Sequence, residues 1–152
     1  MDDERKTNEE ELKGDYEKVD MNLKYLEELY HAYNDKYKET LRRIKETVEH
    51  LNIIYNTQES LEKVDMIKDR EIFSHIGEFL VTPVKLTNFD KFIVDIGSGF
   101  YIEANVEEAK RIISKYRDKF DNEFKTLNNE KRKLLELLLD LSFQIEKLNA
   151  SL

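Results

Sequence analysis

One short segment, residues 71–104, holds most of the residues that turn or interrupt a backbone. Three of the four glycines (Gly77, Gly97 and Gly99) and the single proline, Pro83, lie in it. Many of its other residues are β-branched or aromatic, and such residues favour a pleated, half-buried surface. On both sides of the segment the apolar residues have the spacing of long helices. The sequence therefore predicts a short β region between two long helices.

The second half of this segment predicts a β-hairpin. In FIVDIGSGFYIE the apolar residues alternate, which places Phe92, Val94 and Ile96 on one face of a strand. The Gly-Ser-Gly that follows reverses the chain, because glycine adopts the positive φ of tight turns. The returning strand carries Phe100 and Ile102 on one face.

A first hairpin is expected just before it, with strands at 72–76 and 79–85 joined by a Gly-Glu turn. Pro83 cannot donate a ladder hydrogen bond, so its strand must lie at a sheet edge or a bulge. Residues 87–90 would connect the two hairpins. The segment 71–104 is thus expected to form two β-hairpins.

The first long helix is expected over residues 15–70, after a polar tail at 1–14. Either Asn8 with Glu11, or Asp15, has the chemistry to cap its start. Its apolar seam advances by alternating steps of four and three, with one extra step of four that predicts a stutter. The seam residues are Val19, Leu23, Leu26, Tyr30, Tyr33, Tyr37, Leu41, Ile44, Val48, Leu51 and Tyr55.

The second long helix is expected over residues 105–152. Asn105 and Glu108 have the spacing of a capping box, in which each side chain bonds to the backbone N–H of the other residue. Lys131 takes one position of the apolar seam, and an extra step of four falls between Phe120 and Phe124. The apolar seam consists of Val106, Ala109, Ile113, Tyr116, Phe120, Phe124, Leu127, Leu134, Leu138, Leu141, Ile145, Leu148 and Leu152.

The expected fold is mainly α: a long antiparallel two-helix coiled coil with two β-hairpins at one end. Each helix has a single apolar stripe and needs a partner helix to bury it. The hairpins reverse the chain, so the simplest partner is the other helix of the same chain. A parallel homodimeric coiled coil is the alternative, although it leaves the hairpins without a clear use. The length of 152 residues suggests a single domain.

Composition excludes several functional classes. The net charge is -8 with both signs interspersed, which argues against nucleic acid as a partner. The sequence has no cysteine, and no apolar run approaches the ~20 residues of a membrane helix. Nor does a secretory signal follow Met1, so a cytoplasmic or nucleoplasmic location is expected.

The sequence also contains no convincing catalytic or metal-binding motif. Asp95 to Gly99 (DIGSG) resembles the active-site loop of aspartic proteases, but Ile96 stands where that loop has Thr or Ser, and a strand followed by a turn explains the stretch. The three histidines have no metal-ligand spacing. We therefore expect neither an enzyme nor a bound cofactor or metal.

The apolar hairpins predict assembly with other chains. A lone two-stranded hairpin is marginally stable in water, and open sheet edges invite pairing with other strands. Burying a large apolar side chain contributes roughly 2 kcal/mol, so these hairpins should lie in a sheet or barrel shared among subunits. The residues expected to carry subunit assembly are Phe79, Val81, Phe92, Val94, Ile96, Phe100 and Ile102.

The order helix, two hairpins, helix, with VDIGSGFYIEANVEEA at the second hairpin, resembles an α-type prefoldin subunit. It is most similar to eukaryotic prefoldin subunit 5 and to the archaeal α subunit. The specific resemblance covers residues 71–113, in which Ile96 to Glu103 and the acidic helix start ending at Ala109 match the family pattern. The first hairpin departs from that pattern. Two hairpins, and not one, distinguish the α type from the β type.

This resemblance implies a hexamer of two α-type and four β-type subunits, in which the hairpins form a β-barrel platform. It also implies that the distal tips of the coiled coils hold unfolded proteins and that the complex delivers them to the cytosolic chaperonin without using nucleotide. The alternative is a prefoldin-like coiled-coil scaffold subunit of another multiprotein assembly.

A second apolar stripe marks a candidate client-binding surface near the C-terminus. Leu135, Leu139 and Phe143 recur at intervals of four, outside what a two-stranded seam buries. Tyr25 and Leu29 form a similar extra pair on the first helix. Either these five residues form an exposed patch for unfolded clients, or they widen a packing face or contact a neighbouring subunit.

Overall fold

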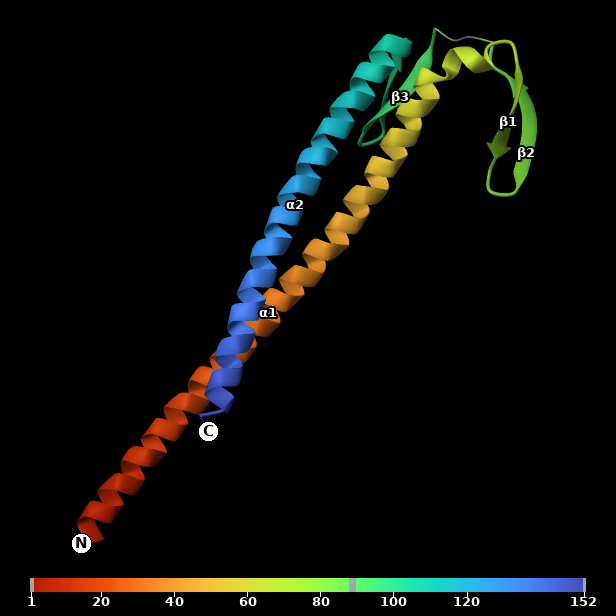
Figure 1. The fold of residues 1–152 in the computed structure, drawn as a ribbon. Coiled ribbons are helices and arrows are strands. Elements are labelled where there is room, and N and C mark those ends of the chain that lie inside the picture. Colours follow the sequence, from red (N-terminus) through yellow and green to blue (C-terminus); the bar gives the residue numbers. More distant parts are fainter. Residues whose placement is uncertain (1, 88–89, 152) are drawn as a thin grey trace. The chain divides into compact units, whose positions relative to one another are not determined.

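The computed structural model describes residues 2–87 and 90–151, and the side chains of these residues except 2–13, 15 and 16. The prediction of two long helices and two antiparallel hairpins is confirmed (Figure 1). In chain order the elements are α1 (Asp2–Glu62), a short 3-10 helix η1 (Val64–Ile67), β1 (Glu71–Ile76), β2 (Leu80–Lys85), β3 (Phe92–Gly97), β4 (Phe100–Ala104) and α2 (Val106–Asn149).

The chain divides into two compact units, where its length suggested one domain. Residues 1–45 with 125–152 form one, called here the helical unit, and residues 46–124 form the other, called the hairpin unit. Paired helices make contacts only with the turns opposite them, so each stretch of a coiled coil packs locally.

Both ends of α1 differ from the sequence-based prediction. The helix begins at Asp2, so the stretch expected to be a tail is helical, and the candidate caps Asn8, Glu11 and Asp15 lie inside the helix. It ends at Glu62, several residues earlier than expected, where η1 follows. Asp69 then has φ of 60°, a left-handed conformation that ends helical structure before β1.

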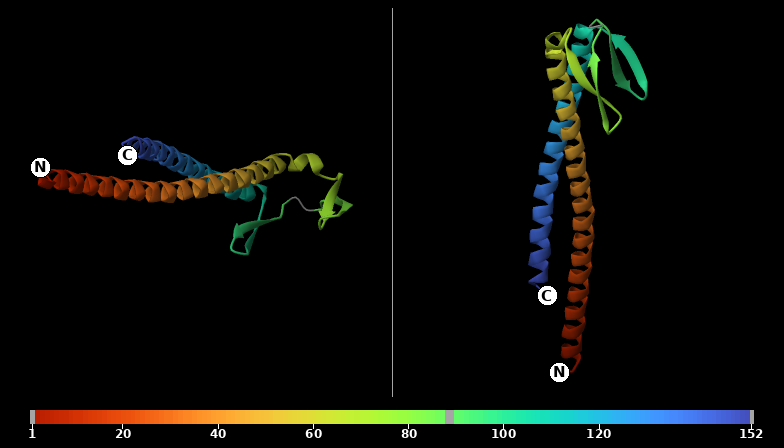
Figure 2. Two further views of the ribbon diagram at one scale, coloured as in Figure 1. Left: turned by 90° about the horizontal axis from the view of Figure 1, so that it is seen from below. Right: turned by 90° about the vertical axis from the view of Figure 1, so that its right-hand side faces the viewer.

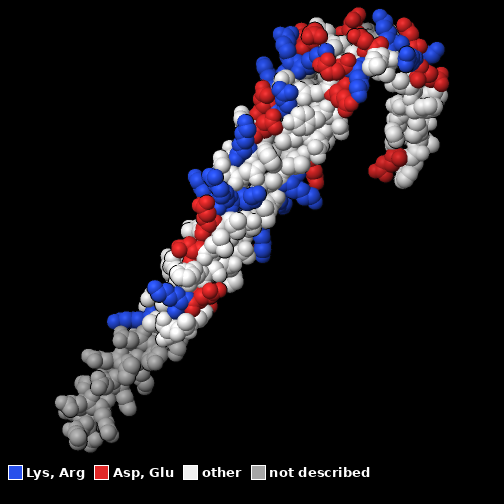
Figure 3. Space-filling view, in the orientation of Figure 1, with Lys and Arg blue, Asp and Glu red and all other residues white. Residues whose placement is uncertain are grey.

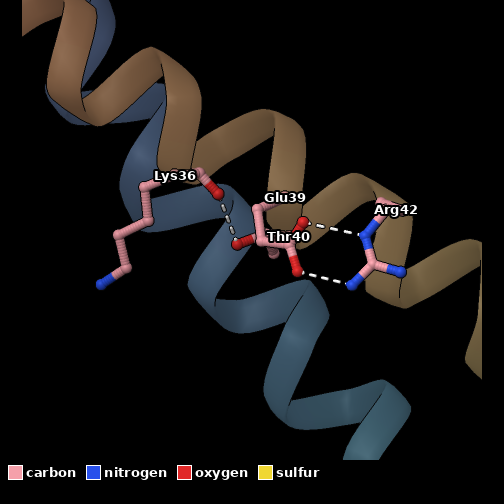
Figure 4. Close-up of polar contacts among 4 residues, drawn as sticks. All are labelled: Lys36, Glu39, Thr40 and Arg42. Carbon is pink, nitrogen blue, oxygen red and sulfur yellow. Dashed lines mark hydrogen bonds and ion pairs between the residues drawn. The ribbon is translucent and has the colours of Figure 1, made fainter.

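The stutter expected in the seam of α1 is wrong. Thr40 and Thr47 are buried at 3% and 4% exposure, whereas Leu41 and Val48 are 40% and 37% exposed. The Thr40 hydroxyl donates to the Lys36 carbonyl oxygen at 2.9 Å, so this polar group is satisfied inside the seam (Figure 4). The steps of four and three therefore continue without interruption through threonines that an apolar pattern passes over. The corrected seam beyond Tyr37 is Thr40, Ile44, Thr47, Leu51, Ile54, Gln58 and Leu61, in which Gln58 is half-buried.

The seam of α2 follows the prediction more closely. Leu127, Leu134, Leu138 and Leu141 are 2–6% exposed, and Lys131 is half-buried at its expected position. The capping box is confirmed in both directions. Asn105 Oδ1 accepts from the Glu108 N–H at 2.9 Å, and Glu108 Oε2 accepts from the Asn105 N–H at 3.0 Å. Leu152 lies outside the described residues.

Inside the helical unit, α1 and α2 run antiparallel. Lys36 Nζ lies 3.3 Å from Glu130 Oε1. Earlier residues of α1 pair with later residues of α2, as Glu27 and Glu146 line one shared hollow. The partner helix is therefore part of the same chain, as the antiparallel prediction requires.

The hairpin unit has its core where β3 and β4 meet the helices. Leu61, Val94, Ala104 and Ala109 are buried together at 2–8% exposure, with Phe92, Ile112 and Ile113 packed against them. The strands pair from Phe92 with Ala104 to Gly97 with Phe100, with a bulge between Asp95 and Gly97. The Tyr116 hydroxyl donates to the Asp95 carbonyl oxygen at 3.5 Å, which links α2 to β3. Figure 2 shows the two hairpins from two further directions.

The first hairpin is separate from this core. Its register pairs Glu71 with Lys85 and Ile76 with Leu80, so Phe79 lies in a three-residue turn and not in the strand. Pro83 pairs with Phe73 in a sheet of only two strands, where each strand is an edge, as expected. No described residue between Glu71 and Thr87 is buried.

Candidate functional site

The second stripe on α2 is exposed. Leu139 and Phe143 are 64% and 66% exposed and Leu135 is 44% exposed, although Leu134 and Leu138 beside them are 5% and 6% exposed. The seam therefore buries its own leucines and leaves these three for another contact. They are called the client stripe below.

The structure does not bring all five expected client residues together. In each helix the residue just before a seam position lies on one edge of the pair and the residue just after it lies on the other. Leu29 precedes the seam residue Tyr30, on the edge that carries Lys36 and Glu130, whereas Leu135 follows Leu134.

Leu29 is half-buried for a reason that can be read from the register. It lies seven residues before Lys36, and Leu137 lies seven residues after Glu130. Seven residues are two helical turns, so these two leucines face each other two turns away from the Lys36–Glu130 pair. Leu29 thus serves packing on that edge, and Tyr25, at 63% exposure, lies on the same side of α1. Apolar spacing groups Tyr25 and Leu29 with the stripe because it carries no information on the direction in which each residue leaves the seam; client binding by Tyr25 stays a prediction.

A hollow of about 380 Å³ adjoins the client stripe. Ser142 follows Leu139 by three residues and Glu146 follows Phe143 by three, so both are neighbours of the stripe on the surface of α2. The surface beside the stripe is therefore concave and is lined partly by polar side chains. Its lining residues are Glu27, Tyr30, His31, Ser142, Ile145 and Glu146.

The residues expected to carry assembly fall into two groups. Val94 is 8% exposed and Phe92 is half-buried, because both pack on the helices in the core of the hairpin unit. The free surface expected for these two residues is therefore not present. The other five are exposed: Phe79 at 92%, Phe100 at 66%, Val81 at 54%, Ile96 at 42% and Ile102 at 38%.

The hairpins also expose large apolar side chains that were not among the expected assembly residues. Ile93 and Tyr101 lie on the face of the second hairpin that points away from its core. The sequence could have indicated them, because β3 and β4 carry apolar residues on both faces. The additional exposed residues are Phe73, Ile76, Leu80, Ile93 and Tyr101, at 59–77% exposure.

Polar residues singled out in the sequence have structural contacts. Asp95 Oδ1 accepts from the Gly97 N–H at 2.8 Å and so holds the turn of the second hairpin. The His50 ring stacks on Phe120 with centroids 5.0 Å apart, and its Nδ1 lies 2.7 Å from the Glu46 carbonyl oxygen.

The described residues contain no group of three or more His, Cys, Asp or Glu side chains arranged to hold a metal. Within the same residues no helix has a stretch apolar and long enough to cross a bilayer.

Comparisons with known proteins agree with this geometry. The family model described as prefoldin subunit matches residues 30–151. "Prefoldin subunit alpha" of Methanobrevibacter smithii is 23% identical over 122 residues, which cover 80% of this chain and 82% of the relative. "Prefoldin subunit alpha" of Saccharolobus islandicus is 26% identical over 120 residues, 76% of this chain and 82% of the relative.

The fold has a counterpart in the cryo-EM structure of filamentous PFD from Methanocaldococcus jannaschii. A chain of that structure aligns with a TM-score of 0.52 and 20% identity, over 80% of this chain and 96% of the other. The match of the family model over most of the chain decides the family. The chain belongs to the prefoldin family and is a subunit of its α type.

Proposed function

We propose that the chain acts in a hexameric prefoldin-type co-chaperone of two α-type and four β-type subunits. The complex holds unfolded proteins and delivers them to the cytosolic chaperonin, without nucleotide and in the cytoplasm. Membership of a family of chaperone-type subunits supports the proposal.

The exposed client stripe is the observation that carries the proposal. Leu135, Leu139 and Phe143 leave apolar surface in water beside a seam that is already filled. Unfolded proteins expose apolar side chains without fixed geometry, so a shallow stripe can hold them without a shaped pocket. Weak binding by one stripe becomes useful when several subunits act on one client together.

The exposed hairpin surfaces support the hexamer. Phe73 and Leu80 in the two-stranded sheet, and Phe79 in its turn, are 64–92% exposed. Neighbouring subunits that pair with these strands would cover the apolar side chains and satisfy the open edges.

The test is protection of a chemically denatured model protein from aggregation by the assembled complex. Replacing Leu135, Leu139 and Phe143 by Ser should weaken protection, at roughly 1 kcal/mol of client binding for each side chain. The melting temperature should change little because the residues are exposed. The control replaces Ile53 and Met66 by Ser, two side chains of similar exposure (64% and 65%) outside the stripe; it should protect like the unmodified complex.

The possible results distinguish client binding by the stripe from the scaffold function and from a packing role. Unchanged protection by the triple variant rejects the stripe as the client site. An assembled complex that gives no protection at all, even unmodified, favours the scaffold function. A large fall in melting temperature would place the three residues in packing.

A further inference from the structure

A second surface of the helical unit lies on the edge opposite the Lys36–Glu130 pair. Five residues of this edge each follow a seam position by one, and in antiparallel helices these positions share one edge. We call it the basic edge. Its residues are Lys38 and Leu41 on α1, and Lys125, Arg132 and Leu135 on α2.

The three cations of the basic edge have no ion-pair partner among the described residues. Lys38, Lys125 and Arg132 are all exposed. The surface around the other edge is balanced instead. Lys36 pairs with Glu130 at 3.3 Å, and Arg42 pairs with Glu39 at 2.6 Å (Figure 4). Figure 3 shows Lys and Arg side chains alternating with Asp and Glu along one face of the helices. The positive charge of the basic edge is therefore not needed for pairing within the described part of the chain.

Exposed leucines lie at the two ends of this row of cations, because the Lys36–Glu130 register places Leu41 opposite Lys125 and Leu135 opposite His31. Leu41 and Leu135 are 40% and 44% exposed on the same edge. A strip with a leucine toward each end and cations between them matches one face of an amphipathic helix whose apolar residues lie about ten positions apart with acidic residues between them. From 125 to 135 the strip spans ten residues of α2, or roughly 15 Å, which is about three helical turns.

The length and the surroundings of the strip disfavour nucleic acid as the occupant. Roughly 15 Å faces only about four phosphates of one strand. Further along the same helix, residues 134–146 contain Glu136, Asp140 and Glu146 and no Lys or Arg. A continuous polyanion would meet these carboxylates, whereas a short peptide ends before them.

We propose that the basic edge docks a short amphipathic helix of a partner protein, with apolar residues toward both ends of one face and Asp or Glu between and beside them. This contact differs from client holding, because it depends on three cations and on leucines at fixed spacing. Leu135 lies at the border of both surfaces, and the cations belong to the basic edge alone.

The probe is a fluorescein-labelled helical peptide of Glu and Leu, about 14 residues long, with Leu at alternating intervals of three and four. Fluorescence anisotropy measures its binding to the full chain at low and at physiological ionic strength. The variant K38E/R132E should weaken binding about tenfold or more, because it reverses two charges of the edge. The control K133E/K147E makes the same charge change at exposed lysines that precede seam residues, on the opposite edge; it should weaken binding by less than about threefold.

Three outcomes would overturn the proposal. The first is an equal loss in both variants, which would mean that only net charge matters. The second is a single-stranded oligonucleotide of equal charge that binds as tightly as the peptide and depends on Lys38 and Arg132. The third is loss of aggregation protection in K38E/R132E, which would make the edge part of the client surface. Retained protection with lost peptide binding supports a separate docking site.

Discussion

The two hairpins are similar in length and in apolar content but differ in what covers them. The second, β3–β4, places Val94 and Ala104 in a core with Leu61 and Ala109. The first, β1–β2, has no buried residue among those described, and Phe73 is 74% exposed. Both hairpins close in a tight turn, so local geometry does not explain the difference.

The difference follows from what each hairpin offers to a helix. Ala104 and Ala109 are 3% and 2% exposed, and their small side chains let strand and helix approach closely. The capping box at Asn105 joins β4 to α2 with one residue between them. On the first hairpin, Ser74 and Thr82 pair at the centre of one face and offer little apolar surface. The second hairpin thus belongs to the chain's own core, and we infer that the first awaits another subunit.

The largest expected effect comes from placing a charge in the core of the second hairpin. Val94→Asp should lower the free energy of unfolding by about 3 kcal/mol or more, because the carboxylate would be buried without a partner. Val81→Asp is the control on the first hairpin, where 54% exposure predicts a change within about 0.5 kcal/mol. Urea unfolding of the full chain, followed by circular dichroism, measures both. Similar losses in the two variants would remove the contrast between the hairpins.

For assembly with other subunits, substitutions in the first hairpin should have the larger effect. Replacing both Phe73 and Val81 by Asp should weaken the complex about a thousandfold, at roughly 2 kcal/mol for each of the two covered side chains, with helix content unchanged. Native mass spectrometry of the reconstituted complex gives the readout. Ile53→Asp, at an exposed position of α1, is the control and should leave the complex intact. A complete hexamer from the double variant would exclude the first hairpin from the platform.

The caps at the junctions between hairpins and helices should contribute a smaller difference in the free energy of unfolding. Asn105→Ala should cost about 1 kcal/mol, because it removes the acceptor that satisfies the Glu108 N–H at the start of α2. No side-chain cap is present at Lys63, where η1 begins on the way to the first hairpin. Asn52→Ala, at an exposed site inside α1, is the control and should be close to neutral. Faster amide hydrogen exchange confined to the first turn of α2 would locate the effect; an unchanged rate would contradict it.

Much of the fold could be predicted because its signals are local. The Gly-Ser-Gly turn, the capping box at Asn105 and the heptad steps of α2 each involve residues close in sequence, and the structure contains all three. The seam of α1 could not be predicted from apolar spacing, because Thr40 satisfies its hydroxyl within its own helix and then occupies a buried position. Polar side chains that bond to the preceding turn are invisible to a hydrophobic pattern.

The site was predicted less completely than the fold. Exposure of Leu139 and Phe143 followed from the width of a two-stranded seam, since they lie beyond the stripe that one partner covers. The burial of Val94 did not follow, because alternation along a strand shows that two faces differ without showing which face meets a helix. Likewise, only the register of the Lys36–Glu130 pair reveals that Leu29 faces Leu137 and leaves the client stripe.

The smallest expected effect concerns an ion pair on the outside of the second hairpin. Lys91 Nζ lies 2.7 Å from Glu103 Oε1, and the hydrogen bond and charge of Glu103 raise the pKa of Lys91 above its ordinary 10.5. A raised lysine pKa stabilises the folded state below the unfolded pKa, and this contribution disappears as pH rises through the folded pKa. Both side chains are about 60% exposed, so Glu103→Gln should leave stability at neutral pH almost unchanged. It should nevertheless lower the Lys91 pKa toward 10.5, which NMR titration of the Lys91 side chain through the alkaline range would detect.

Glu71→Gln is the control at the base of the first hairpin, where the register partners Glu71 and Lys85 form no ion pair among the described residues. A Lys91 pKa that stays constant in Glu103→Gln, or shifts equally in Glu71→Gln, would show that the pair does not distinguish the two hairpins.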